Sequence, residues 1–126
     1  MTYRLDHVNI RTADPERLVE WYGRVLGLES GWRPPFDFPG AWLYAGEHPV
    51  IHLVGVAVTP GAAADAVRIE HFALSGDDLE GFRARLAAAG VESRERPVPG
   101  TDILQFNLRD PDGNHLHIDF RTGETG

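Results

Sequence analysis

The sequence predicts an α+β protein built from two related modules, each with the element order βαβββ. The strongest evidence is an internal repeat: LDHVNI at residues 5–10 is answered by IEHFAL at residues 69–74, and IHL at 51–53 by LHI at 116–118. In both halves a helix-like segment and further strand-like segments follow the first repeat element. A linker rich in Pro, Gly and Ala, TPGAAADAV at residues 59–67, separates the halves.

The first module covers about residues 3–58. Asp14 and Pro15 are typical of a helix start, an apolar pattern of helical spacing follows, and Gly27 is expected to end the helix. The irregular segment PPFDFPG, at 34–40, separates two of the expected strands. Alternating or β-branched apolar residues predict the strands, which are residues 5–11, 29–32, 41–45 and 50–58.

The second module covers about residues 68–120 and repeats this order. Asp77, with Glu80 three residues later, predicts the helix start, and Gly90 predicts its end. The expected strands are residues 69–74, 91–96, 103–109 and 115–120. DPDG before the last strand predicts a tight turn, and residues 121–126 are expected to be a frayed tail.

Composition limits the classes of function. A chain of 126 residues, 42% hydrophobic and 25% charged, fits a single globular domain, residues 1–126, with its own core. The absence of cysteine excludes disulfides, a thiol nucleophile and cysteine-type zinc fingers. A net charge of −7 argues against nucleic acid. No apolar stretch approaches about 20 residues and no signal pattern follows Met1, so we expect a cytoplasmic protein that does not bind membranes.

Four of the six histidines lie at equivalent positions of the repeat. His7 and His71 are 64 residues apart, and His52 and His117 are 65 residues apart. A single strand histidine is usually an ordinary half-buried residue, but the paired recurrence favours a metal site, because imidazole is the commonest metal ligand among side chains. An imidazole set fits a divalent transition metal: zinc, nickel, iron(II), cobalt or copper. His48, in a turn-like segment, is expected at the surface.

Candidates for catalysis and substrate binding come from strand faces. Asp119 and His115 share a face with His117, so either is a candidate base or a group that supports the ligands; the alternative for both is a solvated strand end. Aromatic residues on these strands and the loop between them are expected either to form the wall of an apolar ligand pocket or to pack in the core. Polar residues on the strands are candidates for contacts with the substrate. The candidate substrate-binding residues are Phe36, Trp42, Tyr44, Asn9 and Arg109.

These motifs resemble the vicinal oxygen chelate superfamily, the glyoxalase/bleomycin-resistance/extradiol-dioxygenase group. The resemblance covers nearly the whole chain and rests on LDHVNI, WYGRVLGLE (21–29), VIHLV (50–54), IEHFAL and DPDGNHLHIDF (110–120). It implies a glyoxalase-like fold in which two βαβββ modules form a curved mixed sheet around a metal and a small-molecule substrate. It also implies a homodimer, with the paired modules drawn from one chain or two, and metal ligands on the first and fourth strands. Those ligands here are His7, His52, His71 and His117.

The implied ligand set departs from the group in one respect. Its fourth-strand ligand is often a glutamate, which serves glyoxalase-type isomerisation as the base, and extradiol dioxygenases use two histidines and one carboxylate. Both fourth-strand ligands here are histidines. The resemblance implies a metal-dependent enzyme, a glyoxalase-I-like lyase or isomerase acting on adjacent oxygens. The alternatives are an extradiol-type dioxygenase and a bleomycin-resistance-like protein that sequesters a drug or metabolite. The ligand wall of the latter would be Trp32, Phe36, Phe38, Trp42 and Tyr44.

Overall fold

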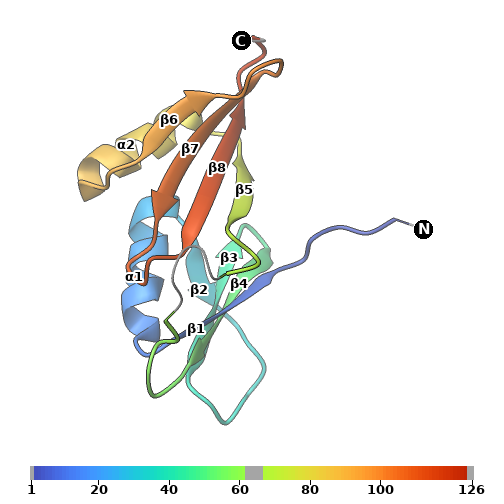
Figure 1. Ribbon diagram of the computed structural model, residues 1–126. Helices are drawn as coiled ribbons and strands as arrows, with labels where there is room; N and C mark the ends of the chain where they lie inside the picture. The colour runs from blue at the N-terminus through green and yellow to red at the C-terminus, as the bar shows by residue number, and fades with distance from the viewer. Residues whose placement is uncertain (1, 62–66, 125–126) are drawn as a thin grey trace. The chain divides into compact units, whose positions relative to one another are not determined.

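The structure is a computed structural model that describes residues 2–61 and 67–124. The chain divides into two compact units, Met1–Gly61 and Ala62–Gly126, which we call module 1 and module 2. Each module has the element order βαβββ, with one helix and a four-stranded mixed sheet (Figure 1). The predicted fold class is therefore confirmed. Among the described residues, no helix is long and apolar enough to cross a membrane.

Module 1 has the sheet order β1-β4-β3-β2, in which β1 runs parallel to β4 and the other neighbours are antiparallel. The parallel pair brings the first and last strands of the module side by side at one edge. Its elements are β1 (Val8–Thr12), α1 (Pro15–Leu26), β2 (Glu29–Gly31), β3 (Gly40–Ala45) and β4 (His48–Gly55).

Module 2 repeats this topology with the sheet order β5-β8-β7-β6, in which β5 runs parallel to β8. The internal repeat of the sequence is therefore a repeat of strand pairing as well. Its elements are β5 (Phe72–Gly76), α2 (Leu79–Ala89), β6 (Arg94–Pro97), β7 (Ile103–Arg109) and β8 (His115–Arg121).

Both helices begin and end in the same way. The side chains of Asp14 and Asp78 each accept a hydrogen bond from the backbone N–H three residues later, at 3.1 and 3.0 Å, and so satisfy a free donor of the first turn. Gly27 and Gly90 end the helices with φ of 75° and 65°, a conformation that glycine adopts without steric cost. The prediction of Asp77 as the second helix start was wrong by one residue, because the carboxylate of Asp78 makes the capping bond.

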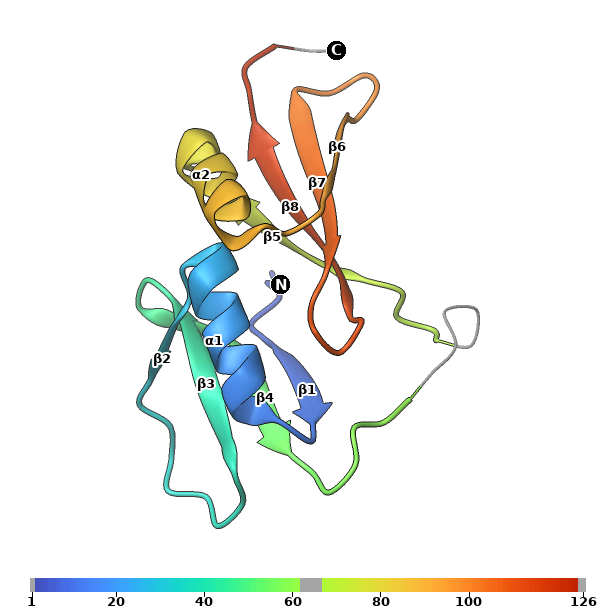
Figure 2. The same cartoon turned by 90° about the vertical axis from the view of Figure 1, so that its left-hand side faces the viewer.

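Each helix lies along one face of its own sheet (Figure 2), and the side chains between them form the core of that module. In module 1, for example, Ile51 and Leu53 are buried while His52 between them lies on the other face. The opposite face of each sheet is therefore left for polar and aromatic side chains. The buried apolar residues are Leu18, Trp21, Tyr22, Val25, Leu28, Ala41, Leu43, Ile51 and Leu53 in module 1, and Phe82, Leu86, Phe106, Leu108, Leu116, Ile118 and Phe120 in module 2.

The first strand of each module begins later than expected, at Val8 and Phe72. Pairing with the neighbouring parallel strand starts only at these residues. His7 and His71 therefore lie just before their strands instead of inside them. This difference leaves both histidine backbones outside the ladder of sheet hydrogen bonds.

The described part of the expected tail makes several hydrogen bonds with Asp102. Arg121 extends β8 and pairs with Asp102 at 2.6 Å, and the backbone N–H of Thr122 donates to the Asp102 carbonyl at 2.8 Å. The carboxylate of Asp102 also accepts from the N–H of Gly123 at 3.3 Å. Arg121 and two backbone bonds lower the pKa of the Asp102 carboxyl.

Candidate metal centre

Three histidines of module 2 gather on the sheet face opposite α2. His115 and His117 are two residues apart on β8 and so share a face, and His71 precedes β5, the neighbouring strand. The rings of His71 and His117 stack with centroids 3.9 Å apart. One ring nitrogen from each of the three lies within 4.8 Å of the others. We call this group the histidine triad.

A single carboxylate orients two members of the triad. Glu70 Oε2 accepts from His71 Nδ1 at 3.1 Å and from His115 Nδ1 at 2.5 Å. The hydrogen bond from His115, with a smaller contribution from His71, lowers the pKa of Glu70. Because Nδ1 of His71 donates to a carboxylate, its Nε2 atom is left as the nitrogen that could bind a metal.

The remaining contacts distinguish His115 from His117. His115 is also held at its second nitrogen, since Nε2 lies 3.1 Å from Asn107 Oδ1, and Asn107 in turn donates to Gln105 at 3.3 Å. His117 is half-buried, and burial together with the nearby His71 lowers its pKa. At neutral pH His117 is therefore in the uncharged form that binds metals.

Module 1 carries the equivalent pair, His7 and His52. Their rings stack with centroids 3.8 Å apart and 12° between planes. Asp6 accepts from His7 Nδ1 at 2.7 Å, as Glu70 does from His71. Burial, with the nearby His7, lowers the pKa of His52. His48 Nε2 donates to the Asp6 carbonyl at 2.8 Å and lies 3.2 Å from the Asp6 carboxylate. His48 is exposed, as expected.

The residues present fit a transition metal. His52 Nε2 is buried and has no hydrogen-bond partner among residues 2–61 and 67–124, which is unusual for a buried polar atom and expected of one that meets a ligand. Metal–imidazole bonds of about 2.0–2.1 Å place tetrahedral nitrogens roughly 3.3 Å apart. The triad nitrogens lie within 4.8 Å of one another, so they must draw closer to bind one ion together.

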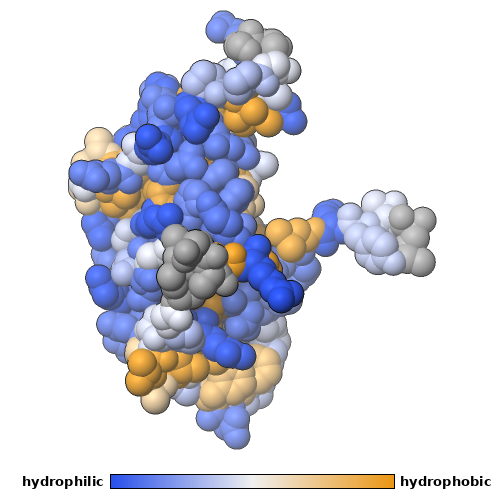
Figure 3. Space-filling model, viewed as in Figure 1, coloured by the Kyte–Doolittle hydropathy of each residue, from blue (hydrophilic) through white to orange (hydrophobic). Residues whose placement is uncertain are grey.

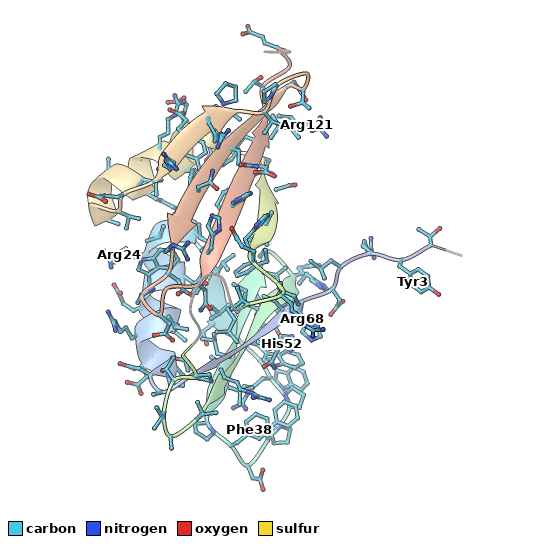
Figure 4. The ribbon with its side chains drawn as sticks, viewed as in Figure 1. Tyr3, Arg24, Phe38, His52, Arg68 and Arg121 are labelled. Atoms are coloured by element: carbon cyan, nitrogen blue, oxygen red, sulfur yellow. The ribbon has the colours of Figure 1, made fainter. Side chains whose placement is uncertain are left out.

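An aromatic cluster continues from His52. Trp42 lies opposite His52 on β3, and their rings stack at 4.0 Å with 8° between planes. Trp32 meets Trp42 edge-on at 6.2 Å, and Phe36 stacks on Phe38 at 4.8 Å. Trp32 is 71% exposed and Phe36 43% exposed. Figure 3 shows hydrophobic surface near the β2–β3 loop, and Figure 4 shows His52 and Phe38 on the same side of module 1.

The other candidate side chains fall into the two modules as follows. Asn9 is the strand partner of His52 and shares its face, whereas Tyr44 is engaged by its hydroxyl, which donates to the Trp32 carbonyl at 2.5 Å. In module 2, Arg109 is the strand partner of His115 and donates to the Gly113 carbonyl at 2.9 Å. Asp119 lies on the same face as His117. Its Oδ1 atom is buried and has no hydrogen-bond partner in the described part of the chain.

The turn before β8 places the triad strand. Asp110 is buried, and its carboxylate accepts from the backbone N–H of Asp112 and Asn114 at 3.0 and 2.9 Å and from the Asn114 side chain at 2.8 Å. Gly113, with φ of 87°, takes the left-handed position. The predicted tight turn is thus a closed hydrogen-bonded loop that fixes where His115 enters the sheet.

Sequence reasoning missed the residues that support the histidines. Asp6 and Glu70 occupy the same position of the repeat, directly before a histidine, and this shared acidic character was a usable signal. The sequence pattern also did not predict the contact of Asn107 with His115. Arg94 and Arg96 were missed because the face they occupy depends on the register of β6 against β7, which the sequence pattern did not define.

The sequence matches the Glyoxalase/Bleomycin resistance protein/Dioxygenase superfamily over residues 4–118. The chain therefore belongs to this superfamily, as the motifs predicted. A search of curated protein sequences found no match.

Solved structures show the same fold over nearly the whole chain. A glyoxalase family protein from Bacillus anthracis is 22% identical with a TM-score of 0.77, covering 97% of this chain and 98% of its own. A glyoxylase/bleomycin resistance protein/dioxygenase domain from Frankia sp. EAN1pec is 20% identical with a TM-score of 0.79, covering 98% and 96%. Lactoylglutathione lyase from Agrobacterium tumefaciens is 18% identical with a TM-score of 0.67, covering 94% of both chains. At these identities the similarity concerns the fold alone.

Proposed function

We propose that this protein is a metal-dependent enzyme, a lyase or isomerase of glyoxalase I type that acts on a small substrate with two adjacent oxygens. The observation that carries the proposal is the histidine triad, whose ring nitrogens lie within 4.8 Å of one another and two of whose members are oriented by Glu70. A surface histidine needs neither such neighbours nor such an acceptor. Lactoylglutathione lyase among the similar folds is consistent with this class of reaction.

The proposed ligands are His71 and His117, together with the equivalent pair His7 and His52. The rings of the two pairs stack at similar centroid distances, 3.9 and 3.8 Å. In each pair the first histidine donates from Nδ1 to the carboxylate of the residue before it. The pair from module 1 belongs to the same chain or to the second chain of a homodimer. A metal held by neutral imidazoles keeps its full positive charge and polarises the two substrate oxygens.

The protein's own residues must move the substrate proton, because no ligand position supplies a carboxylate. His115 is engaged at both ring nitrogens, by Glu70 and Asn107. Asp119 shares the face of His117 and keeps a buried oxygen without a partner in the described residues. We therefore favour Asp119 over His115 as the acceptor of the proton.

The aromatic cluster supports a second candidate, a protein that sequesters an aromatic drug or metabolite without catalysis. Trp32 and Trp42 meet at 90° and 6.2 Å, which forms a corner into which a flat ring fits. In this function the histidines have no catalytic task. The same corner serves the enzyme as a wall for the unreactive part of a substrate.

The deciding experiment is the metal content of the native protein, purified without a histidine tag or chelator, beside the double variant His71→Ala, His117→Ala. We expect close to one metal per site in the native protein and little in the variant, with conversion of dicarbonyl adducts lost together with the metal. The matched control is His48→Ala, an exposed histidine outside both pairs.

The alternatives give different results. If the bound metal is iron and the protein consumes oxygen when a catechol is added, the protein is an extradiol-type dioxygenase and not an isomerase. Absence of metal from the native and the metal-reconstituted protein, with tight binding of an aromatic ligand that Trp42→Ala abolishes, would replace the enzyme by the sequestering protein.

A further inference from the structure

The polar face of module 2 carries three arginines beside the histidine triad. Arg94 on β6 is the strand partner of Asn107, and Arg109 on β7 is the strand partner of His115. Partner residues of antiparallel strands project to the same face of a sheet. Arg96 is two residues beyond Arg94 on the same strand and joins them. The surface over β7 and β8 is mainly hydrophilic (Figure 3).

These side chains line one pocket of module 2. Its volume is about 270 Å³, and its lining is Arg94, Arg96, Asn107, Leu108, Arg109 and His115. Pockets for drug-sized ligands span roughly 300–1,000 Å³, so this one suits a small group. His115 belongs to both the pocket and the triad, so the two are adjacent.

The arginines of the pocket lack anionic partners. Within residues 2–61 and 67–124, Arg94, Arg96 and Arg109 make no ion pair closer than 4.0 Å, although other arginines of the chain do. Glu95, between Arg94 and Arg96, faces the opposite side and pairs with Arg83 of α2. In a protein with a net charge of −7, three cations gathered without a carboxylate repel one another unless an external anion joins them.

We propose that Arg94, Arg96 and Arg109 bind the oxyanion group, a carboxylate or a phosphate, of the small-molecule substrate. This inference rests on the proposed function, since the triad defines where the adjacent oxygens of that substrate bind. The planar guanidinium matches both kinds of oxyanion through paired hydrogen bonds. The chain contains arginines and no lysine. Each of these three positions therefore carries a planar guanidinium that can donate two parallel hydrogen bonds.

The strand spacing gives the substrate its dimensions. His115 lies on β8, Arg109 on β7 and Arg94 on β6, which are successive neighbours in the sheet. Neighbouring strands are about 4.8 Å apart, so the oxyanion lies roughly 5–10 Å from the triad. The substrate class is therefore a short molecule with two adjacent oxygens at one end and a carboxylate or phosphate at the other.

The test measures binding of methyl phosphate and of propionate to the full-length, metal-free protein by calorimetry. Removal of the metal prevents the probe from binding there instead. Two variants are compared with the native protein: the double variant Arg94→Gln, Arg96→Gln and the single variant Arg109→Gln. The matched control is Arg17→Gln on the exposed surface of α1. Arg94 and Arg96 are exposed, so thermal unfolding should confirm that these variants fold.

We expect saturable binding of at least one probe, weakened about tenfold or more by the arginine variants and unchanged in the control. The tighter probe identifies the oxyanion as carboxylate or phosphate. Lack of saturable binding of either probe, or equal binding by the double variant, would overturn the inference. If the protein binds the anion but no metal, the proposed function is wrong and the arginine site is still supported. If it binds metal but no anion, the arginine site is wrong and the proposed function is unaffected.

Discussion

Asp6 and Glu70 hold the same position in the two modules, and each accepts a hydrogen bond from Nδ1 of the histidine that follows it, at 2.7 and 3.1 Å. A carboxylate at this atom sets the tautomer of the imidazole and directs its other nitrogen outward. The repeat therefore includes the supporting carboxylate as well as the histidine. The two modules differ in that Glu70 also reaches His115.

That difference predicts unequal effects of removing the two carboxylates. Glu70→Gln should weaken metal binding about 10–100-fold, because it changes the support of two triad histidines. Asp6→Asn, the matched variant of module 1, should have a smaller effect, since its carboxylate supports one ligand. The measurement is metal affinity in competition with a chromophoric chelator. Equal affinities of Glu70→Gln and the native protein would contradict the role of Glu70.

Replacement of the module 1 pair tests how much of the metal site module 2 provides. The variant His7→Ala, His52→Ala leaves the triad intact, and we expect it to retain metal at reduced affinity. In this variant we expect His115, the third histidine of the triad, to complete the metal site in place of the missing pair, so its further replacement by Ala should release the metal. Elemental analysis after dialysis measures both. Complete loss of metal from the first variant would mean that His115 does not take the place of the missing pair.

The turn before β8 should be important for stability. Asp110→Ala leaves the N–H groups of Asp112 and Asn114 without their acceptor in a buried turn, and the expected loss is about 1–3 kcal/mol. Urea unfolding of the metal-free protein measures it. Asp37→Ala, at an exposed loop position, is the control and should be close to neutral. A native-like midpoint for Asp110→Ala would show that the turn does not depend on this carboxylate.

Acid should destabilise the metal-free protein in a window set by two histidines. Burial is the largest cause of the lowered pKa of His52 and His117 relative to 6.5, so near and below that pH the unfolded chain binds more protons than the folded one. The contribution of these two histidines to the free energy of unfolding is therefore constant above about pH 7.5, and it is lost as the pH falls through 6.5. Thermal midpoints between pH 5 and 8 should show this fall. The variant His52→Gln, His117→Gln should show a flatter profile, and an identical slope would refute the assignment.

The sequence predicted the elements where local signals were strong. Pro15 and Gly27 bound the first helix as expected, and residues 103–109 form β7 without adjustment. The start of α2 was predicted one residue early, at Asp77, because the capping bond is made by its neighbour Asp78. The hydrogen bonds of Thr122 were not predicted, because they depend on Asp102, which is distant in sequence.

The sequence predicted which residues of β8 share a face better than it predicted what those residues contact. The period of two in a strand placed His115, His117 and Asp119 on one face, as observed. It did not indicate that His115 meets Glu70, because that contact joins residues 45 positions apart. The register of β6 likewise decides whether Arg94 or Glu95 faces the histidines, and periodicity alone gives the two arrangements equal weight.

The stack of Trp42 on His52, at 4.0 Å, gives the molecule an optical reporter. An indole in van der Waals contact with an imidazole changes its emission when that imidazole gains a proton or a metal. Trp21 is a buried residue of α1, and Trp32 meets no histidine ring among the described residues, so titrations compared with Trp42→Phe would isolate the signal. Loading of module 1 could thus be followed by fluorescence in real time, without any label.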